Sequence, residues 1–219
     1  MTGGIFDLNF DELPLGIPLF PLSGALLLPG GTLPLNIFEP RYLTMIDRAL
    51  GQSRCIGMIQ PNQTTEDEGT APLYKTGCLG RITSFMETDD GRYIISLQGV
   101  IRFSINREDT NHFGYRDAIC NYSNFRRDME EAETDDLDRN KLLRSLQAYF
   151  DLNSINADWK AIEHTSNHRL VNTLAMICPF SAAEKQAILE AETLVERANI
   201  METIMDMAVH QKNQSFARQ

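Results

Sequence analysis

The apolar positions of this 219-residue chain change their spacing near residue 125, from short alternating runs to longer runs with helical periodicity. Alternation with a period of two residues is typical of half-buried strands. The first half therefore predicts seven strands: Ile17–Phe20, Leu33–Phe38, Cys55–Gln60, Gly77–Met86, Tyr93–Gln98, Ile101–Asn106 and Arg116–Ser123. Asp90-Gly91 predicts a hairpin turn between two of them, because glycine readily adopts the positive φ that such a turn requires.

One helix interrupts this series of strands. Pro40 suits its first turn, since proline has a fixed φ and no N–H to leave unpaired there. Apolar residues at helical spacing follow it: Tyr42, Met45, Ile46, Ala49 and Leu50. Short strands with a single helix indicate a small β-barrel or a rolled sheet.

The second half predicts four or five helices. The first has an apolar stripe at Leu142, Leu143, Leu146, Tyr149 and Phe150. A short helix is expected near Ala157–Glu163, and the next one ends before Pro179. Ser181 and Glu184 have the spacing of a capping box, which opens a further helix. We interpret the apolar stripes as core and expect an α+β protein whose C-terminal part is a helical bundle.

A strongly charged segment separates the two halves. Residues 125–140 hold seven acidic residues and three arginines, so we expect a solvated connector. The predicted division is a β-rich barrel over residues 1–124, an acidic connector over 125–140 and a helical bundle over 141–219. We expect the three parts to form one unit.

The charge balance argues against some classes of partner. Acidic residues outnumber basic ones by 30 to 20, and both halves share the excess. Binding dominated by nucleic acid or anionic lipid is therefore not expected, because it depends on clustered Lys and Arg. The sequence has no apolar run of about 18 residues, no signal-peptide pattern and no CxxC pair among its four cysteines. We expect a cytoplasmic protein with buried, reduced thiols.

Motifs of catalysis and cofactor binding are missing from the sequence. It contains no P-loop, no GxGxxG after a strand, no GxSxG and no HExxH. His164 and His168 lie four residues apart, but Ser166 between them favours a polar turn over a metal site. Nothing in the pattern indicates that one of the lysines is buried, as a catalytic lysine requires. We predict no catalytic residue, no metal and no cofactor.

A proline-rich stretch gives a clearer signal. The prolines Pro21, Pro29 and Pro34 indicate short or edge strands, because proline donates no hydrogen bond to a sheet. Glu39 and Arg41 flank the start of the predicted helix, where a structural role is favoured over a ligand role. Gly99 inside a strand pattern indicates a bulge or a sharp bend.

Four segments of the first half carry a family resemblance: PLFPLSGALLLPGGTLPLNIFEPRY, CIGMIQP, YKTGCLGRI and GVIRFSI. Together with LVNTLAMICPFSAAEKQAILEAETLVERANIM in the second half, they resemble the N-terminal, substrate-binding domain of the Lon protease family. The FEPRY form and the short chain resemble its stand-alone bacterial members. The resemblance implies a PUA-like pseudo-barrel with one inserted helix, followed by a helical bundle. It also implies that the family's ATPase and Ser–Lys peptidase lie in other modules.

The resemblance implies a non-enzymatic module that binds unfolded or degron-bearing polypeptides, or a protease or chaperone partner. The candidate peptide-binding residues are Leu26, Leu27, Leu28, Leu33 and Leu35. The segment Leu26–Pro34 would offer them as an exposed apolar lip, and the favoured alternative is that this segment packs on the barrel. The family-motif residues expected to be structural are Pro29, Gly30, Pro34, Glu39, Arg41, Gly99 and Arg102.

Two alternatives remain open. One is a PUA-like RNA-binding module, for which a basic patch would need Arg81, Arg92, Arg102, Arg107 and Arg116. The other is a hydrolase built from scattered His, Asp and Cys residues, for which no spaced constellation is found.

Overall fold

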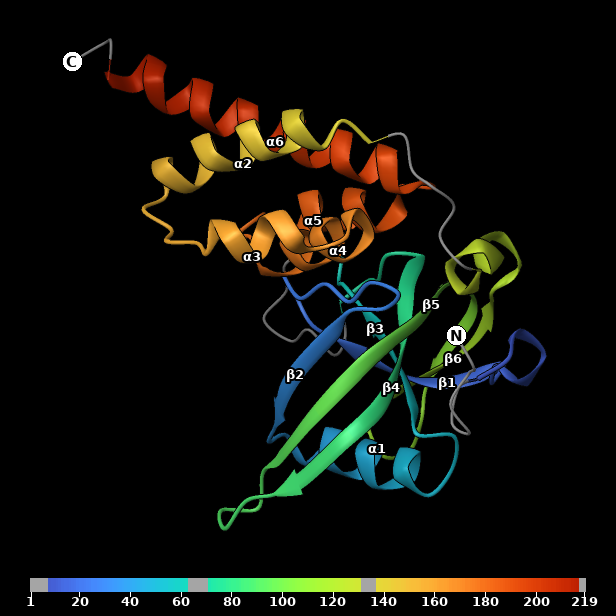
Figure 1. Cartoon of the computed structure of the whole chain (residues 1–219). Coiled ribbons are helices and arrows are strands. Elements are labelled where there is room, and N and C mark those ends of the chain that lie inside the picture. Colours follow the sequence, from blue (N-terminus) through green and yellow to red (C-terminus); the bar gives the residue numbers. More distant parts are fainter. Residues whose placement is uncertain (1–7, 63–70, 131–136, 217–219) are drawn as a thin grey trace. The chain divides into compact units, whose positions relative to one another are not determined.

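A computed structural model describes residues 8–62, 71–130 and 137–216. The chain divides into two compact units, residues 1–131 and 132–219. Figure 1 traces the elements of both units along the sequence. The α+β class predicted from the sequence is confirmed.

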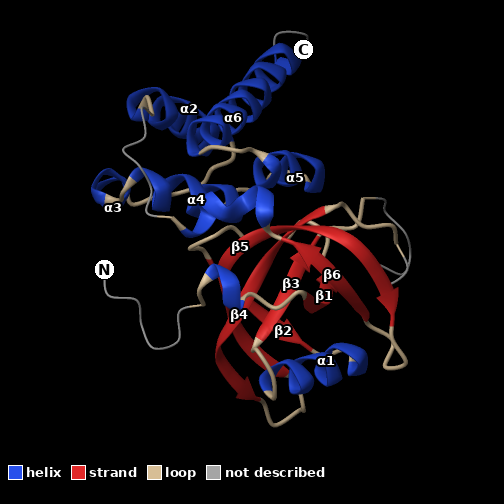
Figure 2. Ribbon diagram, turned by 90° about the vertical axis from the view of Figure 1, so that its right-hand side faces the viewer, coloured by secondary structure: helices blue, strands red, loops and turns tan. Residues whose placement is uncertain are grey.

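The first unit is a closed barrel of mixed strands. Its strands are β1 (Gly16–Pro21), β2 (Thr32–Ile37), β3 (Cys55–Ile59), β4 (Thr76–Glu87), β5 (Tyr93–Thr110) and β6 (Arg116–Asn121). The order is β2-β5-β4-β3-β1-β6, and β6 also pairs with β5, which closes a ring of five strands (Figure 2). β1 and β3 are parallel, and the other pairs are antiparallel. Helix α1 (Pro40–Leu50) is the predicted inserted helix and buries Tyr42, Met45, Ile46 and Ala49.

β5 is one strand where the sequence predicted two. Residues 93–98 pair with β2, residues 93–104 pair with β4, and residues 104–110 pair with β6. The predicted irregularity at Gly99 is present, because the register with β4 shifts between Gly80↔Gly99 and Leu79↔Ile101. The bulge lets the strand bend around the barrel without ending, so the prediction of two separate strands is wrong.

The leucines predicted to form an exposed lip belong instead to the interior. Leu26 and Leu27 are 2% exposed and Leu28 is fully buried. Their loop is fastened to the bulge of β5, since the Gly30 N–H donates to the Gly99 carbonyl and the Gly99 N–H donates to the Gly31 carbonyl. Gly99 leaves room for this approach, because a Cβ there would run into the carbonyl oxygen of Leu28. Three consecutive leucines reach the core because an irregular loop imposes no alternation of side chains.

Part of the predicted acidic connector also packs on the barrel. Ser123–Met129 form the short 3₁₀ helix η2, and Phe125 and Met129 pack against the barrel core. The side chain of Asp128 is only 8% exposed, because it pairs with Arg102 of β5. Residues 125–129 are therefore not a solvated connector. Residues 131–136 lie outside the described part of the chain, and 139–140 already belong to the next helix.

The second unit consists of helices. They are α2 (Arg139–Leu152), α3 (Trp159–His164), α4 (Asn167–Ile177), α5 (Ala182–Glu190) and α6 (Leu194–Phe216). The predicted capping box is present at the start of α5: the Ser181 hydroxyl accepts from the Glu184 N–H, and the Glu184 carboxylate accepts from the Ser181 N–H. No helix in the described ranges is long and apolar enough to cross a membrane.

One lysine of this unit is buried, contrary to the sequence prediction. Lys185 of α5 is 8% exposed, and its ammonium donates to the carbonyl oxygen of Met176, 3.4 Å away, in the last turn of α4. Burial lowers the pKa of this group. The carbonyl end of α4 compensates part of the cost, because the C-terminus of a helix attracts cations.

Candidate functional site

Several of the family-motif residues predicted to be structural make defined contacts in the barrel unit. Gly30 has a φ of +76°, which favours glycine. The Arg41 guanidinium binds the Glu39 carboxylate at 2.9 Å and lies over the ring of Tyr42, 4.8 Å from its centroid. Pro29 is buried, whereas Pro34 is exposed on β2. These contacts fix the geometry of the surface beside them.

That surface is the outer face of β2, β5 and β4. Leu35, Ile95 and Leu97 point into the barrel, so the residues between them point outward. Cross-strand pairing aligns the outward residues in rows, Thr32–Gln98–Arg81, Pro34–Ser96–Ser84 and Asn36–Ile94–Met86. We call the outward residues other than Arg81 the neutral face: Thr32, Pro34, Asn36, Ser84, Met86, Ile94, Ser96 and Gln98.

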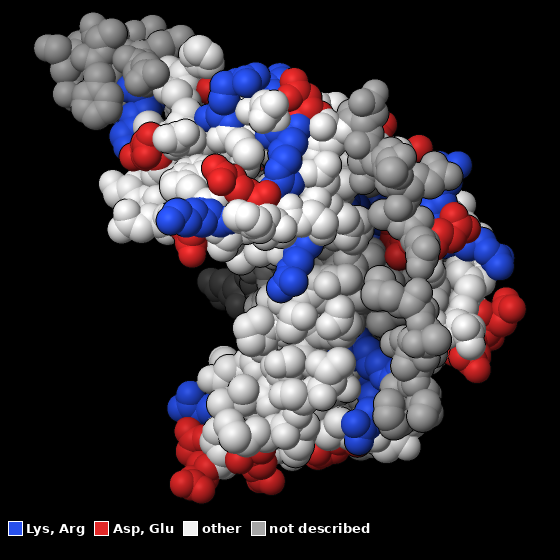
Figure 3. Space-filling view, in the orientation of Figure 1, with Lys and Arg blue, Asp and Glu red and all other residues white. Residues whose placement is uncertain are grey.

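The neutral face exposes apolar side chains. Met86 is 53% exposed and Ile94 is 39% exposed, and Phe38, directly after β2, is 64% exposed. Figure 3 shows a broad uncharged surface here, with charged side chains at its lower margin. Adjacent apolar residues that are exposed on a folded surface are typical of a binding site.

A groove of about 220 Å³ runs along the outer edge of β2. Its lining includes Phe20, Leu22, Pro34, Phe38 and Tyr42. Among the described residues β2 pairs with β5 alone, so no described strand pairs with its other edge. The Gly99 N–H donates to the Gly31 carbonyl, so in β2 the N–H groups of Thr32 and Asn36 point away from β5, toward that edge. Pro34, between them, has no N–H to donate. An extended chain has two donors to bind here, while proline prevents continuous sheet extension.

Of the predicted lip, Leu33 and Leu35 belong to β2 but not to the neutral face. Leu35 points into the core and Leu33 is half-buried. The sequence analysis missed Met86, Ile94 and Phe38. The signal was present in Phe85-Met86 and Ile94-Ile95, where neighbouring residues are both apolar although only one of each pair can face the core.

The turn that joins β4 to β5 carries acidic residues. Gly91 there has a φ of +76°, as the Asp90-Gly91 signal predicts. A hydrogen bond from the Thr88 hydroxyl and the nearby Arg92 guanidinium hold the pKa of Asp90 below its usual value. We call the hairpin of β4 and β5 with its turn the arm. On its inner side, opposite the neutral face, a hydrogen bond to Asp47 raises the pKa of Tyr93.

A second cavity, of about 460 Å³, lies between the end of α1 and strands β1, β5 and β6. The charged groups of its lining bind one another or their neighbours. Arg107 pairs with Asp109 at 3.1 Å, Glu108 pairs with Arg116 at 3.2 Å, and Asp117 accepts from the Asn111 amide at 2.7 Å. This satisfied polar rim makes the cavity a weaker candidate than the neutral face.

The basic patch that RNA binding would need does not form. Arg102 and Arg116 are buried, at 3% and 8% exposure, and Arg92 and Arg107 form ion pairs with Asp90 and Asp109. Among the described residues no cluster of three or more His, Cys, Asp or Glu could hold a metal. Burial raises the pKa of Cys120 and of Cys178 to about 12, which disfavours the thiolate that nucleophilic catalysis requires.

Comparison with known proteins adds the family to this geometry. Residues 16–207 match the family model of the ATP-dependent protease La (LON) substrate-binding domain. The chain belongs to this family. The LON substrate-binding domain thus spans both units, as the motifs in both halves of the sequence implied.

Curated relatives carry the name Lon protease. That of Flavobacterium johnsoniae is 29% identical over 207 residues, which are 93% of this chain and 25% of the relative. That of Parabacteroides distasonis is 36% identical over 102 residues, 46% of this chain and 12% of the relative. This LON-family chain thus covers a quarter or less of these proteases.

Solved structures share the fold. The Lon N-terminal domain protein from Xanthomonas campestris has a TM-score of 0.58 and 23% identity, over 85% of this chain and 96% of that one. The N-terminal domain of Mycobacterium avium complex Lon protease also has a TM-score of 0.58, at 14% identity, over 89% and 98%. The LON substrate-binding fold predicted from the sequence is confirmed.

Proposed function

We propose that this chain is a non-catalytic module that binds unfolded or degron-bearing polypeptides through the neutral face and the groove beside β2. The observation that carries the proposal is the exposure of Met86 and Ile94 on the neutral face and of Phe38 directly after β2. A flexible polypeptide gains free energy by covering such side chains, at roughly 25 cal/mol per Å² of apolar area. The open amides of β2 add main-chain hydrogen bonds.

Family membership supports the same reading, because the matched domain is the substrate-binding one. In this proposal the ATPase and peptidase that give Lon proteases their name are supplied by other modules, or by a protease or chaperone partner. The RNA-binding alternative has no basic patch to support it, so we do not pursue it.

Binding of an unfolded protein tests the proposal. The probe is fluorescein-labelled ribonuclease A that has been reduced and carbamidomethylated, and the readout is fluorescence anisotropy. The double variant Met86→Asp/Ile94→Asp is expected to raise Kd at least tenfold, or about 1.4 kcal/mol. These side chains are exposed, so circular dichroism should show an intact fold.

The matched control is Ile119→Asp. Ile119 of β6 is 50% exposed and lines the second cavity, away from the neutral face. It should leave Kd unchanged within twofold. If Ile119→Asp abolished binding and the double variant did not, the binding surface would be the second cavity and the proposal would fail.

A further inference from the structure

We propose that the neutral face selects apolar polypeptide segments that carry Lys or Arg on one flank, and that the β4–β5 turn binds this cationic flank. This inference rests on the proposed function, because it names the class of segment bound at the same face. Three carboxylates, of Glu87, Asp89 and Asp90, stand against the single guanidinium of Arg92 at this turn.

Two of these carboxylates are available to a ligand. Arg92 is already paired with Asp90, with 2.8 Å between Nε and Oδ2. Glu87 and Asp89 are exposed and form no ion pair with any described residue. A Lys or Arg side chain from outside therefore meets uncompensated negative charge at this end of the face.

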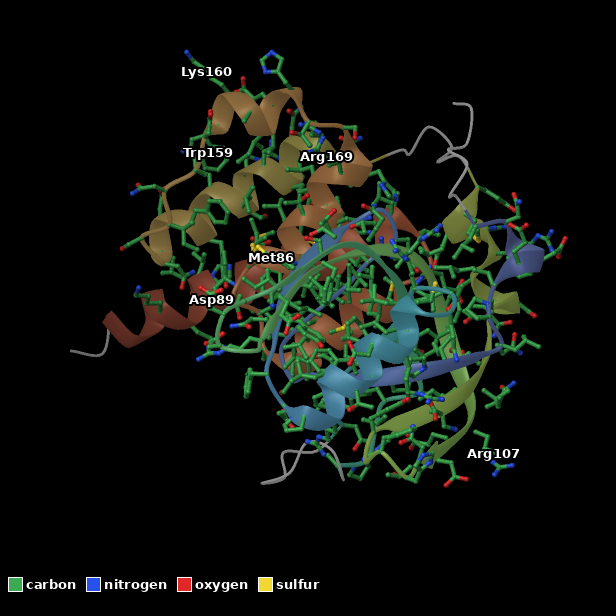
Figure 4. All side chains as sticks on the ribbon, turned by 90° about the horizontal axis from the view of Figure 1, so that it is seen from below. Met86, Asp89, Arg107, Trp159, Lys160 and Arg169 are labelled. Atoms are coloured by element: carbon green, nitrogen blue, oxygen red, sulfur yellow. The ribbon has the colours of Figure 1, made fainter. Side chains whose placement is uncertain are left out.

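The acidic turn lies within reach of the apolar positions. Asp89 lies in the turn, three residues after Met86, whereas Glu87 pairs with Tyr93 at the end of β4 and points to the inner side beside the turn. Figure 4 shows Met86 and Asp89 on the same arm, with Arg107 far from both. An extended chain advances about 3.3 Å per residue. A peptide whose apolar residue rests on Met86 and Ile94 thus brings a side chain two to four positions away to the turn.

The other end of the face has the opposite charge. Arg81 closes the outer row that starts at Thr32, five residues before Met86 on β4. At about 3.3 Å per residue this is roughly 17 Å from the apolar pair. The carboxylates attract a cationic flank to the turn, which gives the bound segment a preferred direction.

The same charges disfavour a second copy of this chain as the occupant. Joining two β4–β5 hairpins edge to edge brings carboxylates of both copies together, and charged side chains at strand edges are a common protection against such pairing. The whole chain carries a net charge of −10, which adds to the repulsion. A cationic polypeptide is the partner that the charge distribution favours.

Three synthetic peptides test the inference. Each contains the same six-residue apolar core, flanked on one side by Lys-Lys-Arg, Ser-Gly-Ser or Glu-Glu-Asp. At 50 mM salt we expect the basic peptide to bind five- to twentyfold more tightly than the serine peptide, and the acidic peptide to bind most weakly. At 500 mM salt the advantage should fall below threefold, because salt screens exposed charges.

The variant Glu87→Gln/Asp89→Asn should remove the advantage of the basic peptide and leave the serine peptide unchanged. The control Asp151→Asn/Glu163→Gln removes the same charge from exposed positions of α2 and α3 and should keep the advantage. If the basic preference survived the first variant or vanished in the control, the inference would be overturned. The proposed function would still stand, provided that Met86→Asp/Ile94→Asp weakened all three peptides.

Light scattering tests whether a second copy of this chain binds the neutral face instead. We expect a monomer mass at micromolar concentration, both with and without the substitutions on the face. A dimer that Met86→Asp/Ile94→Asp dissociates would overturn the inference in favour of a second copy of the chain.

Discussion

Asp128 of η2 binds Arg102 of β5 through both the backbone and the side chain of the arginine. The Arg102 N–H donates to Oδ2 at 2.9 Å, while Nε and Nη2 donate to the two carboxylate oxygens at 2.9 and 2.8 Å. The ring of Phe125 lies 4.9 Å from the guanidinium carbon. This buried pair holds the end of the barrel unit onto its longest strand.

Removing one partner of this pair should destabilise the barrel strongly. Arg102→Met leaves a buried carboxylate without its cation, which costs about 3 kcal/mol. The comparison is Arg107→Met on the same strand, whose pair with Asp109 is 75% exposed on both sides and should cost less than about 0.5 kcal/mol. Hydrogen exchange of β5 amides measures both. Equal losses of protection would contradict the assigned role of Asp128.

Gly99→Ala should be among the most damaging single-methyl substitutions. The added Cβ meets the backbone carbonyl of Leu28, which hydrogen bonds of the neighbouring loop hold in place. We expect a loss of more than about 3 kcal/mol, at the upper end of overpacking costs. Gly51→Ala is the control, because Gly51 has a φ of −77° and its Cβ would make only ordinary contacts. Urea unfolding followed by circular dichroism distinguishes them, and similar midpoints would refute the close packing.

The four cysteines should resist labelling in the folded protein. All four are free and buried, and burial raises the pKa of Cys120 and Cys178 to about 12. At pH 8 only about one such thiol in ten thousand is ionised, and thiol reagents attack the thiolate. Ellman's reagent should detect fewer than one thiol in the first minutes and four after addition of guanidinium. Rapid labelling of the native protein would show that the core opens readily.

Lys185 should give the helical unit a distinct dependence on pH. Burial lowers the pKa of Lys185 in the folded protein below 10.5, its ordinary value in the unfolded chain. Between the folded pKa and 10.5 the unfolded chain binds more protons than the folded one, so the free energy of unfolding rises with pH. The wild type should therefore gain stability relative to Lys185→Met as pH rises from 8 toward 10.5. Urea unfolding followed through Trp159, the only tryptophan, reports on this unit. A flat difference for Lys185→Met would contradict the burial.

Regular elements and their order could be predicted from the sequence, because periodicity and turn residues are local signals. The Asp90-Gly91 turn, the inserted helix at Pro40 and the capping box at Ser181 were found in this way. The burial of Asp128 could not be predicted. Composition marks its segment as acidic, and the compensating arginine lies 26 residues earlier in the chain.

The candidate site could be predicted from the sequence only in part, because it too depends on contacts between residues far apart in the chain. The sequence pointed to β2 and its prolines, but placed the exposed apolar residues in Leu26–Leu28, which the fold buries against the β5 bulge. Met86 and Ile94 lie in different strands, and only the register of β4 with β5 brings them side by side. A surface of this kind depends on strand pairing, which no local pattern reports.

Photo-crosslinking from the neutral face tests the central proposal most directly. Benzoylphenylalanine replaces Ile94 in one protein and Ile119 in another, and each is irradiated with the labelled, unfolded ribonuclease. We predict at least five times more adduct from position 94, and its suppression by excess Lys-flanked peptide. Equal labelling from both positions, or stronger labelling from 119, would contradict the assignment of polypeptide binding to this face.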